Sequence, residues 1–415
     1  MVAAAKRNSC AALAARALAA FVAVLTTSLP APCQAQTVPA LAPDDVSFLL
    51  GRVTLFPAFT LRDTGYDSNV FNDPDNPKGD FTLTAQPRLR ATVPAAGGIL
   101  SGGAAIGLVY YATYKDQQSL NRFFEGRYER AASRLRPFVA GTFNYARDRY
   151  GPEIDARVAH RETSASAGAE LKLTGITSLT GLYRYSTQDY GDDEEFLGSV
   201  LGDQLNRVTD LASAGLRYYI TPITTLVVDF EVQRDRFETS PIRDSDSWRV
   251  MPAAEFGGGG VLTGRVAAGF RKFEPRDALV APFDGLVAAA NVAYTLLGRT
   301  RFTVEGTRDV MYSFDVATPY YLLDSGRITV SQPIGGPIDL IGVASADRLR
   351  YQALEGLPDP HRVTRTTTFG GGMGFRVGQT VRLGLIYEQT KRSSSDIEQR
   401  DYRRHRIFGS VTYGR

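Results

Sequence analysis

Residues 81–93 read FTLTAQPRLRATV, a run in which every second side chain is apolar and those between are polar or charged. Successive side chains of a β-strand point to opposite faces, so this run predicts a strand with one apolar and one polar face. The polar face includes Arg88 and Arg90 in mid-strand. Such a strand suits a wall between lipid and a water-filled lumen.

The same alternation recurs from about Gly51 to the end of the chain, as in the segments that begin near residues 53, 226, 248, 262 and 381. The connections between segments alternate between short and long, which is the asymmetry of outer-membrane barrels with periplasmic turns and extracellular loops. The expected short turns are Pro94–Gly98, Ala131–Ser133, Thr174–Thr177, Thr221–Thr224, Gly257–Gly260, Leu297–Thr300, Gln332–Pro337 and Val377–Thr380. The expected long connections are Asp63–Asp80, Arg147–Arg161, Gln188–Arg207, Arg236–Asp246, Glu274–Asp284, Tyr351–Arg362 and Lys391–Arg400.

These patterns predict an all-β protein, a transmembrane antiparallel up-and-down β-barrel of about 18 strands, with about 16 as the alternative. No apolar run after Leu29 is long enough for a transmembrane helix. A soluble sandwich or propeller also alternates, but charged residues in mid-strand and tyrosines near strand ends favour the membrane barrel. The outward face is ambiguous for segments 210–220 and 338–351. The tyrosines expected in the interfacial girdles are Tyr110, Tyr114, Tyr183, Tyr185, Tyr218, Tyr294 and Tyr387.

The N-terminus indicates secretion. Lys6 and Arg7 precede an apolar stretch, and small residues before position 36 predict cleavage after Ala35. We therefore expect a signal peptide at 1–35, a short periplasmic segment at 36–50 and the barrel at 51–415, in the outer membrane of a Gram-negative cell. Both cysteines, Cys10 and Cys33, lie in the segment to be removed, so the mature chain has no thiol chemistry.

The sequence favours neither an enzyme nor a cofactor-binding protein. Basic and acidic residues number 47 and 44, which gives no electrostatic case for nucleic acid. His160, His361 and His405 lie far apart, at expected loop edges, without metal-ligand spacing, and we expect them at the surface. No serine stands beside a histidine in a recognisable motif. The acidic residues of the 63–80 connection are expected to form turns rather than a calcium site.

The charged residues on the polar strand faces are the candidate site, because they would line the lumen. Two interpretations remain open for them: rings of charge that set ion selectivity, or opposite charges that pair across strands and brace the wall. The predicted pore-lining residues are Arg88, Arg90, Arg184, Asp229, Glu231, Arg249, Arg265, Arg382 and Glu388.

Two short stretches carry a family resemblance. Gly65 to Phe71 reads GYDSNVF, and Pro77 to Phe81 reads PKGDF at the start of the next strand. With the barrel pattern, these resemble the type 2 β-barrel porin family, whose members are often encoded near exopolysaccharide or capsule biosynthesis genes. The resemblance implies a pore or export role and no catalytic residues.

Two functions follow as hypotheses. The first is a porin-like channel or conduit for an oligosaccharide or exopolysaccharide, where the carbohydrate rests on the resemblance. The second is a structural or docking barrel plugged by its own loops. The expected partners are outer-membrane lipid and the barrel assembly machinery, together with a polysaccharide or export machinery if the resemblance holds.

Overall fold

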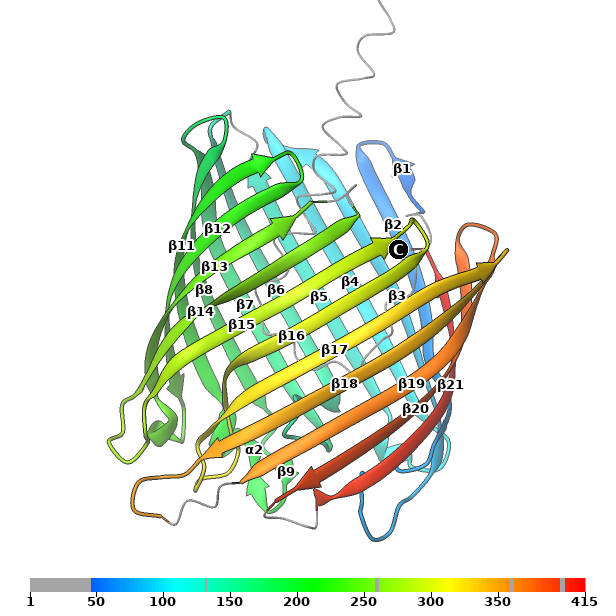
Figure 1. Ribbon diagram of the computed structural model, residues 1–415, viewed down its shortest axis with the longest axis vertical. Coiled ribbons are helices and arrows are strands. Elements are labelled where there is room, and N and C mark those ends of the chain that lie inside the picture. Colours follow the sequence, from blue (N-terminus) through cyan, green and yellow to red (C-terminus); the bar gives the residue numbers. More distant parts are fainter. Residues whose placement is uncertain (1–45, 131–132, 258–260, 358–361, 396–399, 415) are drawn as a thin grey trace, which may run out of the picture.

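The chain forms a closed antiparallel β-barrel of 18 strands, which confirms the predicted fold class and strand number (Figure 1). The computed structural model describes residues 46–130, 133–257, 261–357, 362–395 and 400–414. The barrel strands are β2 (Val53–Asp67), β3 (Asp80–Ala95), β4 (Gly98–Tyr111), β5 (Ser119–Arg130), β6 (Leu135–Arg149), β7 (Arg157–Lys172), β8 (Thr177–Tyr190), β11 (Arg207–Thr221), β12 (Thr224–Phe237), β13 (Ser245–Phe256), β14 (Leu262–Pro275), β15 (Phe283–Leu296), β16 (Thr300–Tyr312), β17 (Tyr320–Gly335), β18 (Ile338–Gln352), β19 (Val363–Val377), β20 (Val381–Ser394) and β21 (Tyr402–Tyr413).

Each strand pairs with its neighbours in sequence, and the first and last barrel strands, β2 and β21, pair to close the ring. We call this β2–β21 pairing the closure seam. A bulge interrupts it between Leu61 and Thr64, where Asp63 has a positive φ of 53°. Beyond the bulge, a Cβ on Gly65 would lie 2.8 Å from the Cα of Phe408. Glycine is therefore needed for the two backbones to meet there.

The stretch GYDSNVF lies at the extracellular end of this seam. The carboxylate of Asp67 accepts hydrogen bonds from the guanidinium of Arg404 on β21 and from the backbone N–H of Asn69. The backbone N–H of Ser68 donates to the carbonyl oxygen of His405 at 2.9 Å, and the N–H of His405 donates back to Oγ of Ser68 at 2.8 Å. The stretch that carries the family resemblance thus fastens the seam.

The two ends of the barrel differ, as the connections predicted. Short turns lie at the end that is uppermost in Figure 1, beside the short strand β1 (Phe48–Leu50), which pairs with the start of β2. The long loops lie at the lower end, with the hairpin of β9 (Glu195–Phe196) and β10 (Ser199–Val200) and the helix α2 (Leu201–Leu205). Single 3-10 turns, η1 (Lys115–Gln117) and η2 (Pro241–Arg243), shape two further loops.

The outer wall is apolar. Large apolar side chains are exposed at alternate positions along the strands, as lipid contact requires, and they include Leu108, Leu216 and Phe270. Six of the seven predicted girdle tyrosines are exposed in barrel strands. The exception is Tyr114, which lies in the loop after β4 and packs edge-on against Phe71.

The structure resolves the outward face of β18. Its residues alternate between buried and exposed, with Ile341, Val343, Leu349 and Tyr351 buried on the inner side. Leu349 and Tyr351 pack there with Tyr321 and Leu323 of β17. Because apolar residues occupy both faces of β18, hydrophobicity alone could not choose between them.

The N-terminal predictions fall on residues that the structure does not describe. The signal peptide at 1–35 and most of the 36–50 segment lie outside the described residues. Within the part of the chain that is described, no helix has the length and apolar character needed to cross a membrane.

A matched pair of substitutions tests which face meets lipid. Leu216 on β11 points outward and is 48% exposed, whereas Leu182 on the adjacent strand β8 lies on the inner face. We expect Leu216→Arg to lower the free energy of unfolding by roughly 2–4 kcal/mol, because a charge on the lipid face must leave water. Leu182→Arg should cost much less. Denaturant unfolding in lipid vesicles measures both, and equal losses would contradict the assigned faces.

Candidate functional site: the lumen and its extracellular mouth

The inner face of β12–β16 carries a row of ion pairs built from opposite charges on neighbouring strands. Arg249 on β13 donates to Glu231 on β12 at 2.8 Å and reaches Asp309 on β16 at 2.9 Å. Asp309 also accepts from Arg271 on β14 at 2.7 Å. One carboxylate therefore joins two guanidinium groups, and the three strands β13, β14 and β16 are tied together across the inner wall. Charge-assisted bonds of this kind are stronger than neutral ones.

A second group of charges lies beside the first, nearer the periplasmic turns. Arg265 on β14 donates to Asp229 at 2.5 Å and to Glu255 at 2.7 Å. Glu255 is also ion-paired with Arg217 on β11. Arg184 on β8 stands in the electrostatic field of Glu231 and Arg249 from the first group. The charges of this side of the lumen are thus shared among several strands.

The opposite side of the wall repeats the arrangement. Arg382 on β20 pairs through two guanidinium nitrogens with Asp339 on β18, and both side chains are almost completely buried. Gly374 on β19, the strand between them, leaves the space that the pair occupies. Farther along β20, Glu388 accepts from Arg406 on β21 at 2.7 Å.

Arg88 and Arg90 on β3 differ from the other predicted lining residues. Arg88 is exposed and has no hydrogen bond or ion pair with any residue that the structure describes. The guanidinium of Arg90 lies over the ring of Phe56 on β2, 4.8 Å from its centroid. Both arginines belong to the alternating run 81–93, and both lie at inward positions of β3.

The nine predicted lining residues therefore all lie on inward positions, and most of them are paired. Asp229, Glu231, Arg249, Arg265, Arg382 and Glu388 take part in ion pairs across strands. Pairing braces the wall and cancels much of the fixed charge. Arg88 and Arg184 lie at inward positions without an ion pair among the described residues, and of the two Arg88 is the more exposed.

The extracellular mouth contains a second candidate site, centred on the loop between β6 and β7. Glu153 in this loop is only 2% exposed. Its carboxylate accepts from Oγ of Ser313 at 2.7 Å and from the backbone N–H of Phe314 at 3.3 Å, both in the loop between β16 and β17. Its backbone carbonyl accepts from Arg392, near the end of β20, and from Arg400, in the loop before β21. Three loops from well-separated strands are tied at one residue.

The neighbouring Asp155 extends this network. Its carboxylate pairs with Arg392 at 3.0 Å. Its carbonyl oxygen accepts from Nε of Arg149 at 2.9 Å and from the side-chain amide of Asn72, which belongs to the loop between β2 and β3. The loop of Glu153 and Asp155 is thus held from both sides of the closure seam.

An apolar core completes the mouth. It brings together residues of β7, β8, β12 and the loops that follow β6, β8 and β16, and we call it the mouth cluster. Its buried members are Ile154, Val158, Tyr190, Phe196, Leu201, Leu205, Phe237 and Phe314. Burying large apolar side chains stabilises the loops by about 1.5–3 kcal/mol for each side chain. The loops therefore form a packed layer at the extracellular end.

Burial also shapes the chemistry of Glu153. Withdrawal from water disfavours its ionised form and raises the pKa of this carboxyl above its ordinary value, against the opposing effects of the Ser313 hydrogen bond and of Arg400 and Arg362. The group therefore exchanges its proton at a higher pH than an exposed glutamate.

The packed layer of loops at the extracellular mouth was not predicted from the sequence. Sequence reasoning treated the 147–161 and 188–207 connections as polar loops, although Ile154, Phe196 and Leu201 were visible in them as isolated apolar residues. It also placed His160 at the surface, which is wrong: His160 is 1% exposed and packs against the rings of Tyr150 and Tyr190. His405 is exposed as expected, and His361 lies outside the described residues.

The acidic loop after β2 forms turns, as predicted. Oδ1 of Asp73 accepts from the backbone N–H groups of Asp75 and Asn76, and Asp80 accepts from those of Thr113 and Tyr114 in the next loop. No group of three or more potential metal ligands occurs among the described residues.

Comparison with known proteins identifies the family. The sequence model of the family described as "Putative beta-barrel porin 2" matches residues 44–415. The chain belongs to this family. Membership and fold together point to an outer-membrane channel protein rather than an enzyme. No curated protein matches the sequence.

Several solved porin structures are similar to the chain. A BenF-like porin from Pseudomonas fluorescens Pf-5 has 10% identity and a TM-score of 0.47, over 87% of this chain and 99% of that one. OccK2 (OpdF) from Pseudomonas aeruginosa, solved with glucuronate, has 9% identity and a TM-score of 0.49, over 86% and 98%. OpdK from the same organism has 10% identity and a TM-score of 0.48, over 86% and 98%.

The buried pair on β18 and β20 gives a stability prediction. A methyl group at Gly374 would collide with the guanidinium of Arg382 and lie 2.6 Å from Oδ1 of Asp339. We expect Gly374→Ala to separate the pair and to lower the free energy of unfolding by roughly 3–5 kcal/mol, because a buried charge then lacks its partner. Gly342→Ala is the control, since no atom lies within 4 Å of its added Cβ. Similar unfolding curves for the two variants would refute the requirement for space at Gly374.

Proposed function

We propose that this barrel is a gated conduit for hydrophilic solutes, that its cargo is an oligosaccharide or an exopolysaccharide chain, and that the mouth loops are the gate. The observation that carries the proposal is the inner wall of the 18-stranded barrel, which presents ion pairs on β11–β14, β16, β18, β20 and β21. Barrels of 16 to 18 strands enclose an aqueous channel. A polar wall of this kind hydrates a passing solute.

The carbohydrate is supported by chemistry and by the family resemblance. Sugar hydroxyls both donate and accept hydrogen bonds, and guanidinium–carboxylate pairs such as Arg249 with Glu231 offer both functions side by side. Six of the nine predicted lining residues are ion-paired, so their charges largely compensate one another, which suits a polyhydroxylated chain better than a small ion. A polysaccharide or its export machinery would be the partner.

One observation favours the alternative function, a plugged docking barrel. The mouth cluster is a well-packed apolar core, and Glu153 and Asp155 connect loops from around the rim. A mouth that never opens would leave the loops as a binding surface for a polymer or an envelope protein. The two functions differ in whether the loops separate.

A matched pair of variants in one loop distinguishes them. Leu201 in α2 is completely buried in the mouth cluster, whereas Leu197, four residues earlier, is 55% exposed. Leu201→Asp places an unpaired carboxylate in the apolar core, so we expect the loops to separate and single-channel conductance in a planar bilayer to rise several-fold over that of the unaltered protein. Leu197→Asp should leave conductance unchanged.

The cargo is tested on the opened variant. Neutral oligosaccharide should interrupt the current of Leu201→Asp in a concentration-dependent manner. A folded, inserted Leu201→Asp protein that passes no current would exclude the conduit and support the docking barrel. Current that no oligosaccharide interrupts would retain a channel and reject the carbohydrate cargo.

The raised pKa of the Glu153 carboxyl leads to a prediction for how the proposed gate depends on pH. Because burial raises the pKa of this carboxyl, the closed mouth holds its proton more tightly than an open one does. The stabilisation of the closed mouth is therefore complete below the ordinary pKa of 4.5 and is lost as pH rises through the raised value. We expect conductance to fall when the extracellular side is acidified from pH 7 to pH 4. Glu153→Gln, which stays neutral, should remain closed across this range, and an unchanged pH response in this variant would assign the effect to another group.

A further inference from the structure

The outer wall has a hollow over β14–β19, on the side that faces lipid. Its volume is about 580 Å³. Small residues form its floor on five successive strands, and they are Ala268, Ala288, Ala290, Gly306, Gly326 and Ala346. Elsewhere the lipid-facing wall carries large side chains such as Leu286, which is 70% exposed. An elongated apolar group can lie against the backbone in this hollow, where side-chain volume is missing.

Arginines border the extracellular side of the hollow. Asp324 on β17 pairs with Arg308 on β16 at 2.5 Å and with Arg350 on β18 at 2.9 Å, so both of its oxygens are occupied. Arg348 on β18 lies directly opposite Arg365 on β19 in the strand register. Both are exposed, and neither has a hydrogen bond or ion pair with another described residue. Directly opposed like charges repel, so this pair destabilises the wall unless an anion lies between them.

These arginines lie at the edge of the apolar band. Toward the periplasmic turn, the outward positions of β18 after Arg348 are Ala346, Ala344, Gly342 and Leu340. Eight residues of strand at about 3.3 Å each, tilted by about 40°, span roughly 20 Å of an apolar band that is about 25 Å tall. Arg348 is thus placed at the level of the lipid headgroups in the extracellular leaflet, with the hollow below it in the hydrocarbon.

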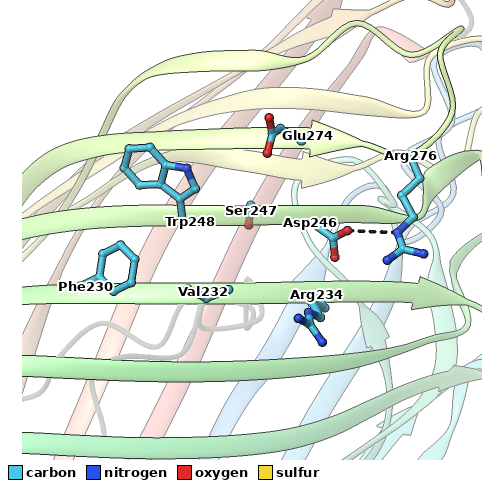
Figure 2. Close-up of a pocket in the computed structure, with 8 residues that line it drawn as sticks. All are labelled: Phe230, Val232, Arg234, Asp246, Ser247, Trp248, Glu274 and Arg276. Carbon is cyan, nitrogen blue, oxygen red and sulfur yellow. Dashed lines mark hydrogen bonds and ion pairs between the residues drawn. The ribbon is translucent and has the colours of Figure 1, made fainter.

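In a second outer hollow, over β12–β14, basic side chains have acidic partners. Phe230 and Trp248 lie along its apolar part, and Asp246 bonds to Arg276 at 3.0 Å (Figure 2). Asp246 also accepts from Arg236, and Lys272 pairs with Glu274. Acidic partners are therefore present within that cluster. Around the first hollow, by contrast, Asp324 pairs with Arg308 and Arg350, and it forms no ion pair with Arg348 or Arg365.

We propose that the hollow over β14–β19 binds a phosphate-bearing lipid of the extracellular leaflet. The phosphate lies between Arg348 and Arg365, because a guanidinium group forms paired hydrogen bonds with phosphate oxygens and two of them compensate one phosphate dianion. An acyl chain lies over the alanine and glycine floor. The lipid removes the repulsion between the two arginines and fills the gap in the wall. This site lies on the outer face and is independent of conduction through the lumen.

The test measures binding of lipid A, a phosphorylated and acylated glucosamine disaccharide, to the refolded full-length mature chain in detergent micelles by native mass spectrometry. The unaltered protein should retain at least one lipid A molecule per barrel and lose it when the phosphates are removed from the lipid. Arg348→Ala with Arg365→Ala should weaken binding by about tenfold or more, as expected when bonds to a charged group are lost.

Two further variants keep the proposal falsifiable. Ala346→Trp fills the floor and leaves both arginines in place, so it should weaken binding of lipid A without changing its dependence on phosphate. Arg276→Ala removes an arginine from the second hollow and should bind as the unaltered protein does. Far-ultraviolet circular dichroism verifies that each variant is folded. Equal binding of lipid A by all variants would overturn the site. A second contradicting outcome is that the unaltered chain forms dimers or trimers and the double variant does not, while lipid binding stays the same. The hollow would then be an interface between copies of the chain.

Discussion

The pairing of β2 with β21 is the interaction on which the rest of this structure depends. A sheet in lipid cannot leave N–H and C=O groups unpaired at an edge, so the barrel must close or fail to insert. Closure here requires a bulge at Asp63, the absence of a side chain at Gly65, and the ion pair of Asp67 with Arg404 where the seam reaches the mouth. Once the ring is closed, alternation along each strand assigns one face to lipid and the other to the lumen.

That division explains why charge behaves differently on the two faces. In the lumen, arginines and carboxylates meet across strands at 2.5–2.9 Å, as Arg265 does with Asp229 and Arg249 does with Asp309, so the desolvation of these charges is offset by a partner. On the outer face an unpaired charge is costly. The pair of Arg348 and Arg365 is therefore the feature of the outer wall that most needs a partner from outside the chain, whereas Arg88 in the lumen can remain hydrated.

Much of the fold could be predicted because its signal is local. Alternation over ten residues indicates a strand and its faces, and turn-forming residues mark most connections. Two connections escaped this reasoning, at 112–118 and 313–319, because aromatic and apolar residues such as Tyr114 and Phe314 continue the strand pattern through them. The faces of β18 were undecidable for the same reason. Parity correctly placed the nine predicted lining residues on inward positions, but it could not give their pairing partners, because the strand register decides which carboxylate lies opposite each arginine.

The mouth could not be predicted at all, and the reason concerns sequence distance. Glu153 meets Ser313 and Arg392, which follow it by 160 and 239 residues, and nothing in the local sequence of any of them indicates the others. Only the circular order of strands brings these loops over one opening. Loops anchored on distant strands share a small apolar core there, so a single charge introduced into it, or a single proton lost from Glu153, acts on several loops together. Each strand of the barrel wall, by contrast, is hydrogen-bonded to two neighbouring strands along its length. In the conduit that we propose, the loops control passage and the paired charges below them select the solute.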